Sequence, residues 1–396
     1  SYFGRHDRPQ EAGLIDWSGS ASEIARMIRA LDFGERYPNP FCAAKVFHGG
    51  RALLVREPEL VDPGEQAAPG TLLSVDETGW SVACGEGALR LASFVCPRGH
   101  AFTPVTAAER LGLVVGDLIG HADTFDRVAL GELHAACVPR EAYWERRLLR
   151  LDPVEAPYRR SAGGNGDGAT ASLSASVSER RVERLPIEVA VPGEGDERAE
   201  TLIAGFLLYL SRIQGLDRFD VTFAEDALTS RVASFGELFS PTVPLAVALN
   251  PDSSAAEAVT AVRSGLEKVR EKGTYLTDLV ARTPELAAHP LHLAGHATSV
   301  AVGLHADPEA SDLPAGTDLA LHVDPTGETA RLVYDTGAFD AGDVARLRDQ
   351  LGVLLGALDR DGVGFSELPL IDDAERRRIL YDWNQTGVDF DRTATV

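Results

Sequence analysis

The apolar and polar positions near the C-terminus predict a strand, a tight turn and a long helix. Residues 332–334 (LVY) alternate as a strand does, and residues 335–337 (DTG) are turn formers. A helix is predicted from Phe339, because apolar side chains then recur every three or four residues, at Val344, Leu347, Leu351, Leu354, Leu355 and Leu358.

From Pro186 onward, strand and helix patterns alternate. Apolar faces predict helices over residues 199–212 and 254–272. Strands are predicted at residues 187–191, 219–223 and 243–249, and at 319–323 and 331–334, which pair as a hairpin across the turn DPTG. This alternation indicates an α/β lobe.

The first part of the chain predicts one helix followed by short strands. Ser20 and Glu23 have the spacing of a capping box, and Ile24, Ile28 and Leu31 form the apolar face of the helix. Glycine turns then separate brief strands, at residues 43–50, 51–60, 68–75, 80–84 and 88–91. Several short strands at such spacing favour a small β-barrel. Two more helices, over 123–136 and 142–148, lead into the second half.

Composition limits the classes of partner. The 396 residues are 44% hydrophobic, enough for ordinary buried cores, and the net charge of −22 disfavours nucleic acid, whose phosphates require clustered Lys and Arg. No apolar run reaches the roughly 18 to 20 residues of a spanning helix, so we expect no membrane partner. The four cysteines lack metal-site spacing and are interpreted as buried, reduced thiols of a cytoplasmic protein. A start without Met suggests a piece excised from a longer protein.

Five short segments of the first part carry a family resemblance: residues 13–17 (GLIDW), 20–24 (SASEI), 28–30 (IRA), 69–71 (PGT) and 85–89 (GEGAL). They resemble the C-terminal subdomain of the methionyl-tRNA formyltransferase family, which is an OB-like barrel. The resemblance implies that the family's catalytic core, with its folate pocket, would lie upstream of Ser1.

The second half resembles a condensation domain of nonribosomal peptide synthetases. Tyr143 and Trp144 resemble its YW motif, and three closing signatures occur in the expected order, LPL at 368–370, DDAER at 372–376 and WNQT at 383–386. The resemblance implies that the chain passes on to an adenylation domain. It also implies a C-terminal lobe in 180–387, one of two chloramphenicol-acetyltransferase-like halves.

The expected fold class is therefore α+β multidomain, with a small OB-like β-barrel followed by a chloramphenicol-acetyltransferase-like α/β lobe. The expected boundaries are a barrel in 1–118, a helical bridge and glycine-rich loop in 119–179, the lobe in 180–387, and a linker in 388–396.

The chemistry that the condensation resemblance implies is missing from the sequence. Amide formation there depends on an HHxxxDG motif in the N-terminal lobe. The nearest string, GHADTFD, has a single His121, which we interpret as a helix-start residue. The place of the family's GTPxxxR stretch reads AEDALTSR and keeps only Arg231. We expect no catalytic, cofactor-binding or metal-binding residue, and phosphopantetheine only on a partner carrier protein.

Other polar clusters have ordinary interpretations. His289, His292 and His296 lack the HExxH context of a zinc site and are interpreted as loop or strand-end residues. Asp372, Asp373 and Glu375 indicate a solvated helix start. The loop SAGGNGDGATA at 161–171 is interpreted as a flexible connection, with a phosphate cradle as the alternative.

A basic patch supplies the candidate contact residues. Arg146, Arg147, Arg150, Arg159 and Arg160 lie close together in an acidic chain. Two interpretations stay open for them, ion pairs with neighbouring acidic surface, or contacts to a partner or to phosphopantetheine. Arg231 joins them as a candidate partner contact.

The sequence therefore favours a non-catalytic structural or recruitment module of a peptide synthetase. Such a module would be a platform for an adjacent adenylation domain and would dock a carrier protein or a tailoring enzyme. The alternative is the rear part of an N-formylating region whose folate-binding core lies upstream.

Overall fold

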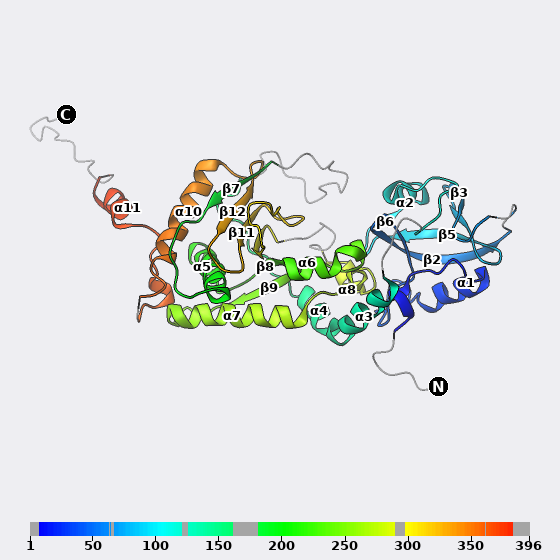
Figure 1. Cartoon of the computed structure of the whole chain (residues 1–396), viewed down its shortest axis with the longest axis horizontal. Coiled ribbons are helices and arrows are strands. Elements are labelled where there is room, and N and C mark those ends of the chain that lie inside the picture. The colour runs from blue at the N-terminus through cyan, green and yellow to red at the C-terminus, as the bar shows by residue number, and fades with distance from the viewer. Residues whose placement is uncertain are drawn as a thin grey trace, which may run out of the picture.

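The computed structural model describes residues 8–62, 64, 67–120, 126–160, 181–289, 298–360 and 362–382. Two units lie side by side along the long axis, with α3 (Arg127–Cys137), α4 (Glu141–Leu148) and α8 (Pro284–Ala287) between them (Figure 1). The architecture is mixed α+β, with one sheet in each unit, which confirms the fold class at that level. No helix in the described part is long and apolar enough to cross a membrane.

The N-terminal unit is a six-stranded antiparallel sheet that α1 (Ala21–Ala30) and α2 (Pro104–Leu111) cover. Its strand order is β1-β2-β5-β4-β3, with β6 paired to β5. A short 3₁₀ turn, η1 (Gln10–Gly13), precedes α1. The strands are β1 (Lys45–His48), β2 (Arg51–Val61), β3 (Leu72–Asp76), β4 (Gly79–Ala83), β5 (Ala88–Val95) and β6 (Ala101–Phe102). The predicted strands are confirmed, and β6 and α2 add to them.

Local chemistry accounts for two features of this unit. The Ser20 hydroxyl accepts from the Glu23 backbone N–H at 3.3 Å and Glu23 reaches back to the Ser20 N–H at 3.2 Å, so the predicted capping box of α1 is confirmed. Gly85 must be glycine, because a Cβ there would lie 1.9 Å from the carbonyl oxygen of Ser18. This close approach links the GEGAL turn to the segment that precedes α1.

The C-terminal unit is a six-stranded mixed sheet in the order β7-β12-β11-β10-β8-β9. β8, β10 and β11 are parallel neighbours, and the other pairs are antiparallel. The strands are β7 (Val182–Pro186), β8 (Arg218–Glu225), β9 (Thr242–Ala248), β10 (Val300–Leu304), β11 (Leu319–Val323) and β12 (Ala330–Asp335). The predicted hairpin is confirmed as β11 and β12.

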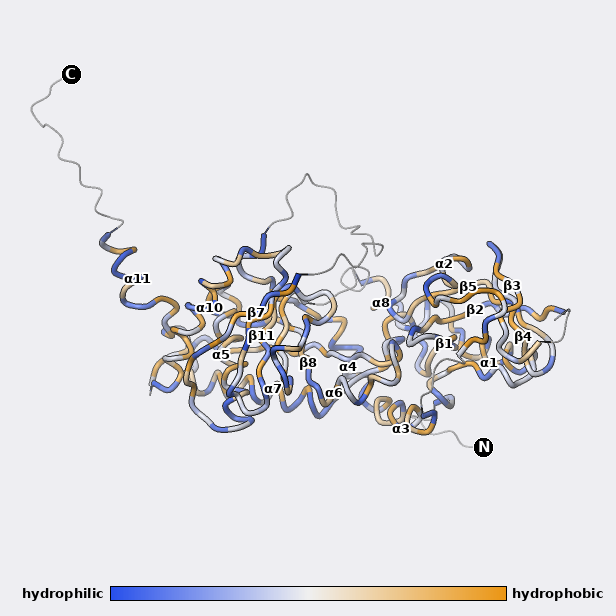
Figure 2. Tube along the Cα trace, turned by 45° about the horizontal axis from the view of Figure 1, so that its top comes forward, coloured by the Kyte–Doolittle hydropathy of each residue, from blue (hydrophilic) through white to orange (hydrophobic). Residues whose placement is uncertain are grey.

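Three helices form the core of this unit together with one face of the sheet, α5 (Asp196–Gln214), α7 (Ala255–Lys272) and α10 (Ala341–Leu355). The middle of α5 is buried on all sides, and a Cβ on Gly205 would lie 2.3 Å from Leu355 of α10, so glycine permits this close packing. Figure 2 shows apolar residues along the central strands of both units. The remaining short elements are α6 (Asp226–Val232), η3 (Ala233–Leu238), η4 (Thr277–Leu279), η5 (Phe365–Glu367), α11 (Asp373–Arg377) and a π-helical turn (Arg378–Asp382).

Three sequence predictions were wrong in detail. The strand expected at 187–191 is irregular chain, and the edge strand is β7, just before it. Ile187 and Val191 are nevertheless buried in the core of this unit, and the Ile187 N–H still donates to the Ala330 carbonyl on β12 at 3.0 Å. The last long helix begins at Ala341 rather than Phe339. The helix expected from residue 123 begins at Arg127, with Asp126 as its N-cap.

Candidate functional site

A buried cluster of charges joins the two units. The Lys45 ammonium on β1 lies 2.6 Å from the Asp278 carboxylate in η4, and the two side chains are 1% and 0% exposed. Arg282 bonds to the other oxygen of Asp278 at 3.0 Å and also to Glu141 at the start of α4. Arg8 lies 3.3 Å from Glu141 and extends the chain of charges. Opposite charges therefore alternate across the boundary between the units.

Backbone groups complete this cluster. The Lys45 ammonium donates to the carbonyls of Ala12 and Ala43 at 2.6 and 2.9 Å, and the Ala43 N–H donates to Asp278 at 3.0 Å. Burial would raise the pKa of Asp278, but Lys45 and Arg282 lower the pKa of this carboxyl to about 2. Removing one partner of such a pair strongly destabilises the fold, because it leaves a buried charge without a counter-charge.

A second contact fixes the same boundary. Gly236 in η3 has a φ of 49°, and a Cβ there would lie 2.1 Å from the carbonyl oxygen of Gly50 in the β1–β2 turn. The neighbouring Glu237 N–H donates to that oxygen at 2.9 Å, and the Glu237 carboxylate takes two bonds from Arg110 at 2.7 and 2.8 Å. Five side chains of the second unit join the core of the first, those of Val232, Phe235, Leu238, Phe239 and Leu276. The two units therefore share a packed, charge-paired boundary.

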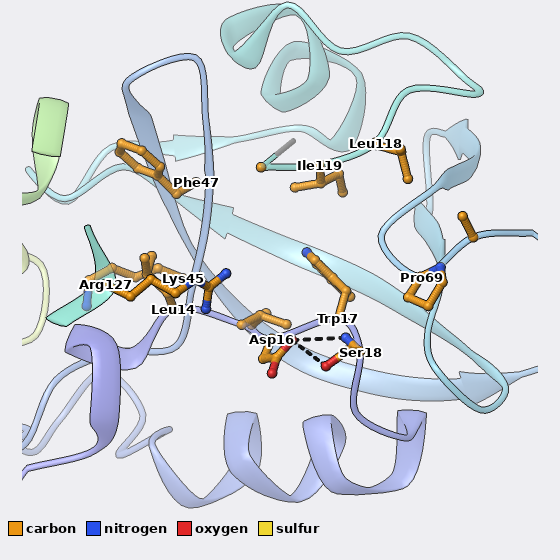
Figure 3. Close-up of a pocket in the computed structure, with 13 residues that line it drawn as sticks. Leu14, Asp16, Trp17, Ser18, Lys45, Phe47, Pro69, Leu118, Ile119 and Arg127 are labelled. Carbon is orange, nitrogen blue, oxygen red and sulfur yellow. Dashed lines mark hydrogen bonds between the residues drawn. The ribbon is translucent and has the colours of Figure 1, made fainter. Parts of the chain in front are cut away.

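A cavity of about 330 Å³ lies beside this boundary in the N-terminal unit (Figure 3). Its walls come from the segment before α1, from β1, from the loops around Pro69 and Ile119, and from Arg127 of α3. The volume falls at the lower end of the range of small-molecule sites. The lining residues are Leu14, Ile15, Asp16, Trp17, Ser18, Lys45, Phe47, Ala68, Pro69, Leu118, Ile119, Gly120 and Arg127.

The predicted arginines divide into paired and unpaired side chains. Arg147 forms a two-pronged pair with Asp220 on β8, one bond of which is 3.0 Å. Arg159 lies 2.8 Å from Asp318, and Arg160 donates to the carbonyls of Thr336 and Phe339. These three side chains therefore make ion pairs or backbone hydrogen bonds within the chain.

The other three candidates are exposed. Arg146, Arg150 and Arg231 make no ion pair with a described residue. Arg231 lies at the end of α6. Burial raises the pKa of the Cys137 thiol, and the positive charge of Arg231 partly opposes this rise. For Arg146, Arg150 and Arg231 the partner contact stays a prediction.

The ends of the parallel strands hold two histidines that the sequence analysis did not single out. His305 follows β10 and its Nδ1 lies 2.7 Å from Asp226, while Nδ1 of His322 on β11 lies 2.6 Å from the Ser311 hydroxyl. The rings lie 4.5 Å apart, above Gly303, whose missing side chain leaves room for them. Burial and the neighbouring His305 lower the pKa of His322 to about 3, so this ring is neutral.

Several sequence predictions fall outside the described residues, namely those for His121, the loop 161–171, His292, His296 and the WNQT signature. Among the described residues, no group of three His, Cys, Asp or Glu side chains could hold a metal ion. Asp372 caps α11 by accepting from the Glu375 N–H at 2.6 Å, which confirms the helix-start interpretation. All four cysteines are free and buried, as predicted.

The charged cluster was missed by sequence reasoning, although two signals pointed to it. Lys45 stands in the middle of the apolar strand AAKVF, where a lysine needs a buried partner. Asp278 and Arg282 have the i,i+4 spacing of a helical ion pair within an apolar stretch. Neither signal identifies which residues contact one another in the folded chain.

The comparison of sequences and the comparison of structures point to different classes of protein. Residues 9–105 match the family described as formyl transferase, C-terminal domain. The methionyl-tRNA formyltransferase of Ectopseudomonas mendocina is 37% identical over 118 residues, which are 29% of this chain and 34% of that protein. That of Marinobacter nauticus is 34% identical over 96 residues, which are 24% of this chain and 29% of that protein. The chain thus spans about a third of the length of these relatives.

Solved structures similar to the chain include an X-domain complex and a condensation domain. The complex of the X-domain and OxyB from teicoplanin biosynthesis has a TM-score of 0.44 and 17% identity, covering 74% of this chain and 72% of that one. The starter condensation domain of rhizomide synthetase RzmA has a TM-score of 0.38 and 14% identity, covering 68% and 63%. TM-scores below 0.5 do not establish a common fold. The chain thus carries a segment that matches the formyl transferase C-terminal domain family, and its structural neighbours are condensation domains and the X-domain.

Proposed function

We propose that the chain is a non-catalytic structural or recruitment module of a nonribosomal peptide synthetase, with a formyltransferase-type OB-like barrel fused to a chloramphenicol-acetyltransferase-like lobe. It is a platform for an adjacent adenylation domain and docks a carrier protein or a tailoring enzyme. The sequence resemblance of the second half suggests the class of protein. The four buried thiols fit a reducing, cytoplasmic location.

One observation carries this proposal, the buried boundary between the units. A platform must present its surfaces in a fixed arrangement, and domains joined by small polar interfaces move relative to one another. Here the Lys45–Asp278 pair is buried and η3 packs into the core of the other unit. Such a boundary supports a rigid body.

The C-terminal end offers a surface on which to test docking. Leu380 and Tyr381, in the turn after α11, are 49% and 65% exposed. Burial of one large apolar side chain contributes roughly 1.5 to 3 kcal/mol, which corresponds to at least about tenfold in affinity.

The experiment is a calorimetric titration of the chain with separately purified adenylation and carrier domains of the same synthetase. We expect binding, and we expect the double variant Leu380→Asp, Tyr381→Asp to weaken binding of the adenylation domain at least about tenfold. The matched control is Val114→Asp, because Val114 is 65% exposed in the N-terminal unit. Absence of binding to either domain contradicts the proposal, and so does an equal loss in the control.

A further inference from the structure

A cluster of cations lies where α4 meets the C-terminal end of α7 (Figure 1). Tyr143 of α4 lies between the two helices, and the ammonium groups of Lys268 and Lys272 lie 5.7 and 5.8 Å from the centre of its ring. The Arg140 guanidinium donates to the Lys272 carbonyl at 3.3 Å and so joins the two helices at the same place. Three cations therefore surround one half-buried aromatic ring.

Two more arginines extend this cluster along α4 and the turn that follows it. Arg146 and Arg150 follow Tyr143 by three and seven residues, a spacing that keeps side chains on one side of a helix. Arg147 points into the fold instead, where it pairs with Asp220. The basic face is the name used below for the five cations Arg140, Arg146, Arg150, Lys268 and Lys272.

Most of the basic face lacks a counter-charge. Arg146, Arg150 and Lys268 are exposed and make no ion pair with a described residue. Lys272 pairs with Glu271 at 2.7 Å. Across residues 140–150 and 264–272, the carboxylates that are not buried are those of Glu145, Glu267 and Glu271. Five cations against three carboxylates leave a local net charge of about +2, in a chain whose net charge is −22.

These features fit a short acidic segment of protein. Lys268 and Lys272 repel each other at i,i+4 spacing, and the Tyr143 ring offsets only part of their charge. Carboxylates would remove this repulsion and would also pair with the exposed guanidinium groups. Tyrosine and arginine are enriched in protein interfaces, where an aromatic ring is covered by apolar atoms of the partner. A long polyanion is disfavoured, because beyond the basic face it would meet the negative charge of the remaining chain.

We propose that the basic face docks a short acidic segment of a partner protein. Asp and Glu carboxylates of the partner pair with Arg146, Arg150 and Lys268, and an apolar side chain of the partner covers Tyr143. This inference deepens the docking role proposed above and rests on it. Its test uses a synthetic peptide instead of an adenylation or carrier domain, so a failure here is distinguishable from a failure of the proposed function.

The test is a fluorescence polarisation titration of the whole chain with a fluorescein-labelled peptide of sequence EELEELEELEE. The control peptide has Gln in place of every Glu. We expect the acidic peptide to bind with a Kd of about 100 μM or below at low salt, and the control peptide at least about tenfold more weakly. Raising the salt to about 0.3 M should weaken the acidic peptide at least about threefold, because the exposed charges are then screened.

The double variant Arg146→Glu, Lys268→Glu should weaken the acidic peptide at least about tenfold, because like charges then face each other. Both side chains are exposed, and circular dichroism checks that the fold is kept. The matched control Arg36→Glu, Arg377→Glu makes the same change of net charge at exposed positions outside the basic face, and should bind within about twofold of the unmodified chain.

Four outcomes would overturn the proposal. The first two are equal affinity for the acidic and the Gln peptides, and equal weakening in the two double variants, which would show an effect of net charge alone. The third is displacement of the labelled peptide by a single-stranded oligonucleotide as readily as by the unlabelled acidic peptide, which would show a site for any anion. The fourth is a dimer of the chain that Arg146→Glu, Lys268→Glu dissociates in sedimentation, which would show that a second copy covers the basic face.

Discussion

Replacing Asp278 by Asn tests the boundary between the units most sharply. The side chain is fully buried and holds Lys45 and Arg282 together, whose own side chains are 1% and 3% exposed. Asn keeps the size and one acceptor but removes the charge, so two buried cations then face the single carboxylate of Glu141. We expect the variant to lose about 3 to 5 kcal/mol of unfolding free energy at pH 7, the cost of breaking a buried pair from one side.

The pKa of Asp278 predicts how this loss depends on pH. The folded pKa is about 2 against an ordinary value of 3.8, so ionised Asp278 stabilises the folded state above about pH 4. This stabilisation is lost as the pH falls from 3.8 towards 2, and the difference corresponds to about 2 kcal/mol. The difference in unfolding free energy between the unmodified chain and Asp278→Asn should therefore shrink by about 2 kcal/mol as the pH falls from 3.8 towards 2.

The assay is guanidinium denaturation at pH 7, 4 and 2.5, with hydrogen exchange of β1 and η4 as a local readout. The double variant Lys45→Met, Asp278→Asn serves as the control, because it removes one charge of each sign. It should be less destabilised than the sum of the two single variants by at least about 1 kcal/mol. The reasoning would be refuted if the losses of the two single variants simply added up in the double variant. It would also be refuted if the difference in unfolding free energy between the unmodified chain and Asp278→Asn stayed constant down to pH 2.5.

Three further predictions concern other parts of the chain. Arg147→Ala should lower the unfolding free energy by about 3 kcal/mol in denaturant titrations, because it leaves the buried Asp220 carboxylate without its counter-charge. The control Arg146→Ala, at an exposed position, should change it by no more than about 0.5 kcal/mol, and equal effects would contradict the pairing. Gly236→Ala should speed hydrogen exchange in the β1–β2 turn, since its Cβ meets the Gly50 carbonyl, while Gly215→Ala, with similar positive φ and open space, should leave that turn unchanged. The pKa of His322, about 3 in the folded chain against 6.5, predicts that stability falls by about 2 kcal/mol from pH 6.5 to 5; His322→Gln should flatten that slope in a denaturation series, and an unaltered slope would count against a neutral buried ring.

Elements with a strong local signal were predictable. The capping box at Ser20, the apolar stripe of α10 and the β11–β12 hairpin all depend on residues close together in the sequence. The edge strand β7 was misplaced, because VERLP is less apolar than the IEVAV segment that follows it. Pairing of an edge strand with β12 is a tertiary choice that local propensity does not decide.

The site was harder to predict than the fold. The Lys45–Asp278 pair and the Gly236–Gly50 contact join segments that lie far apart in the sequence. The cavity is likewise assembled from separate segments, and GLIDW was noticed only as a family signature, not as the source of Asp16 and Trp17. Among the arginines, spacing could not distinguish Arg147, which is paired, from the exposed Arg146 next to it.

A distance measurement between the two units tests the rigid platform most directly. Spin labels at Val114→Cys and Asp349→Cys would report on the boundary, because both positions are well exposed, at 65% and 66%, and lie in different units. The native cysteines are buried, and burial raises the pKa of Cys42 to about 11 and of Cys137 to about 12, so they should resist labelling. A single narrow distance distribution by pulsed electron resonance is the predicted result. A broad or two-peaked distribution would show units that move independently and would contradict the platform.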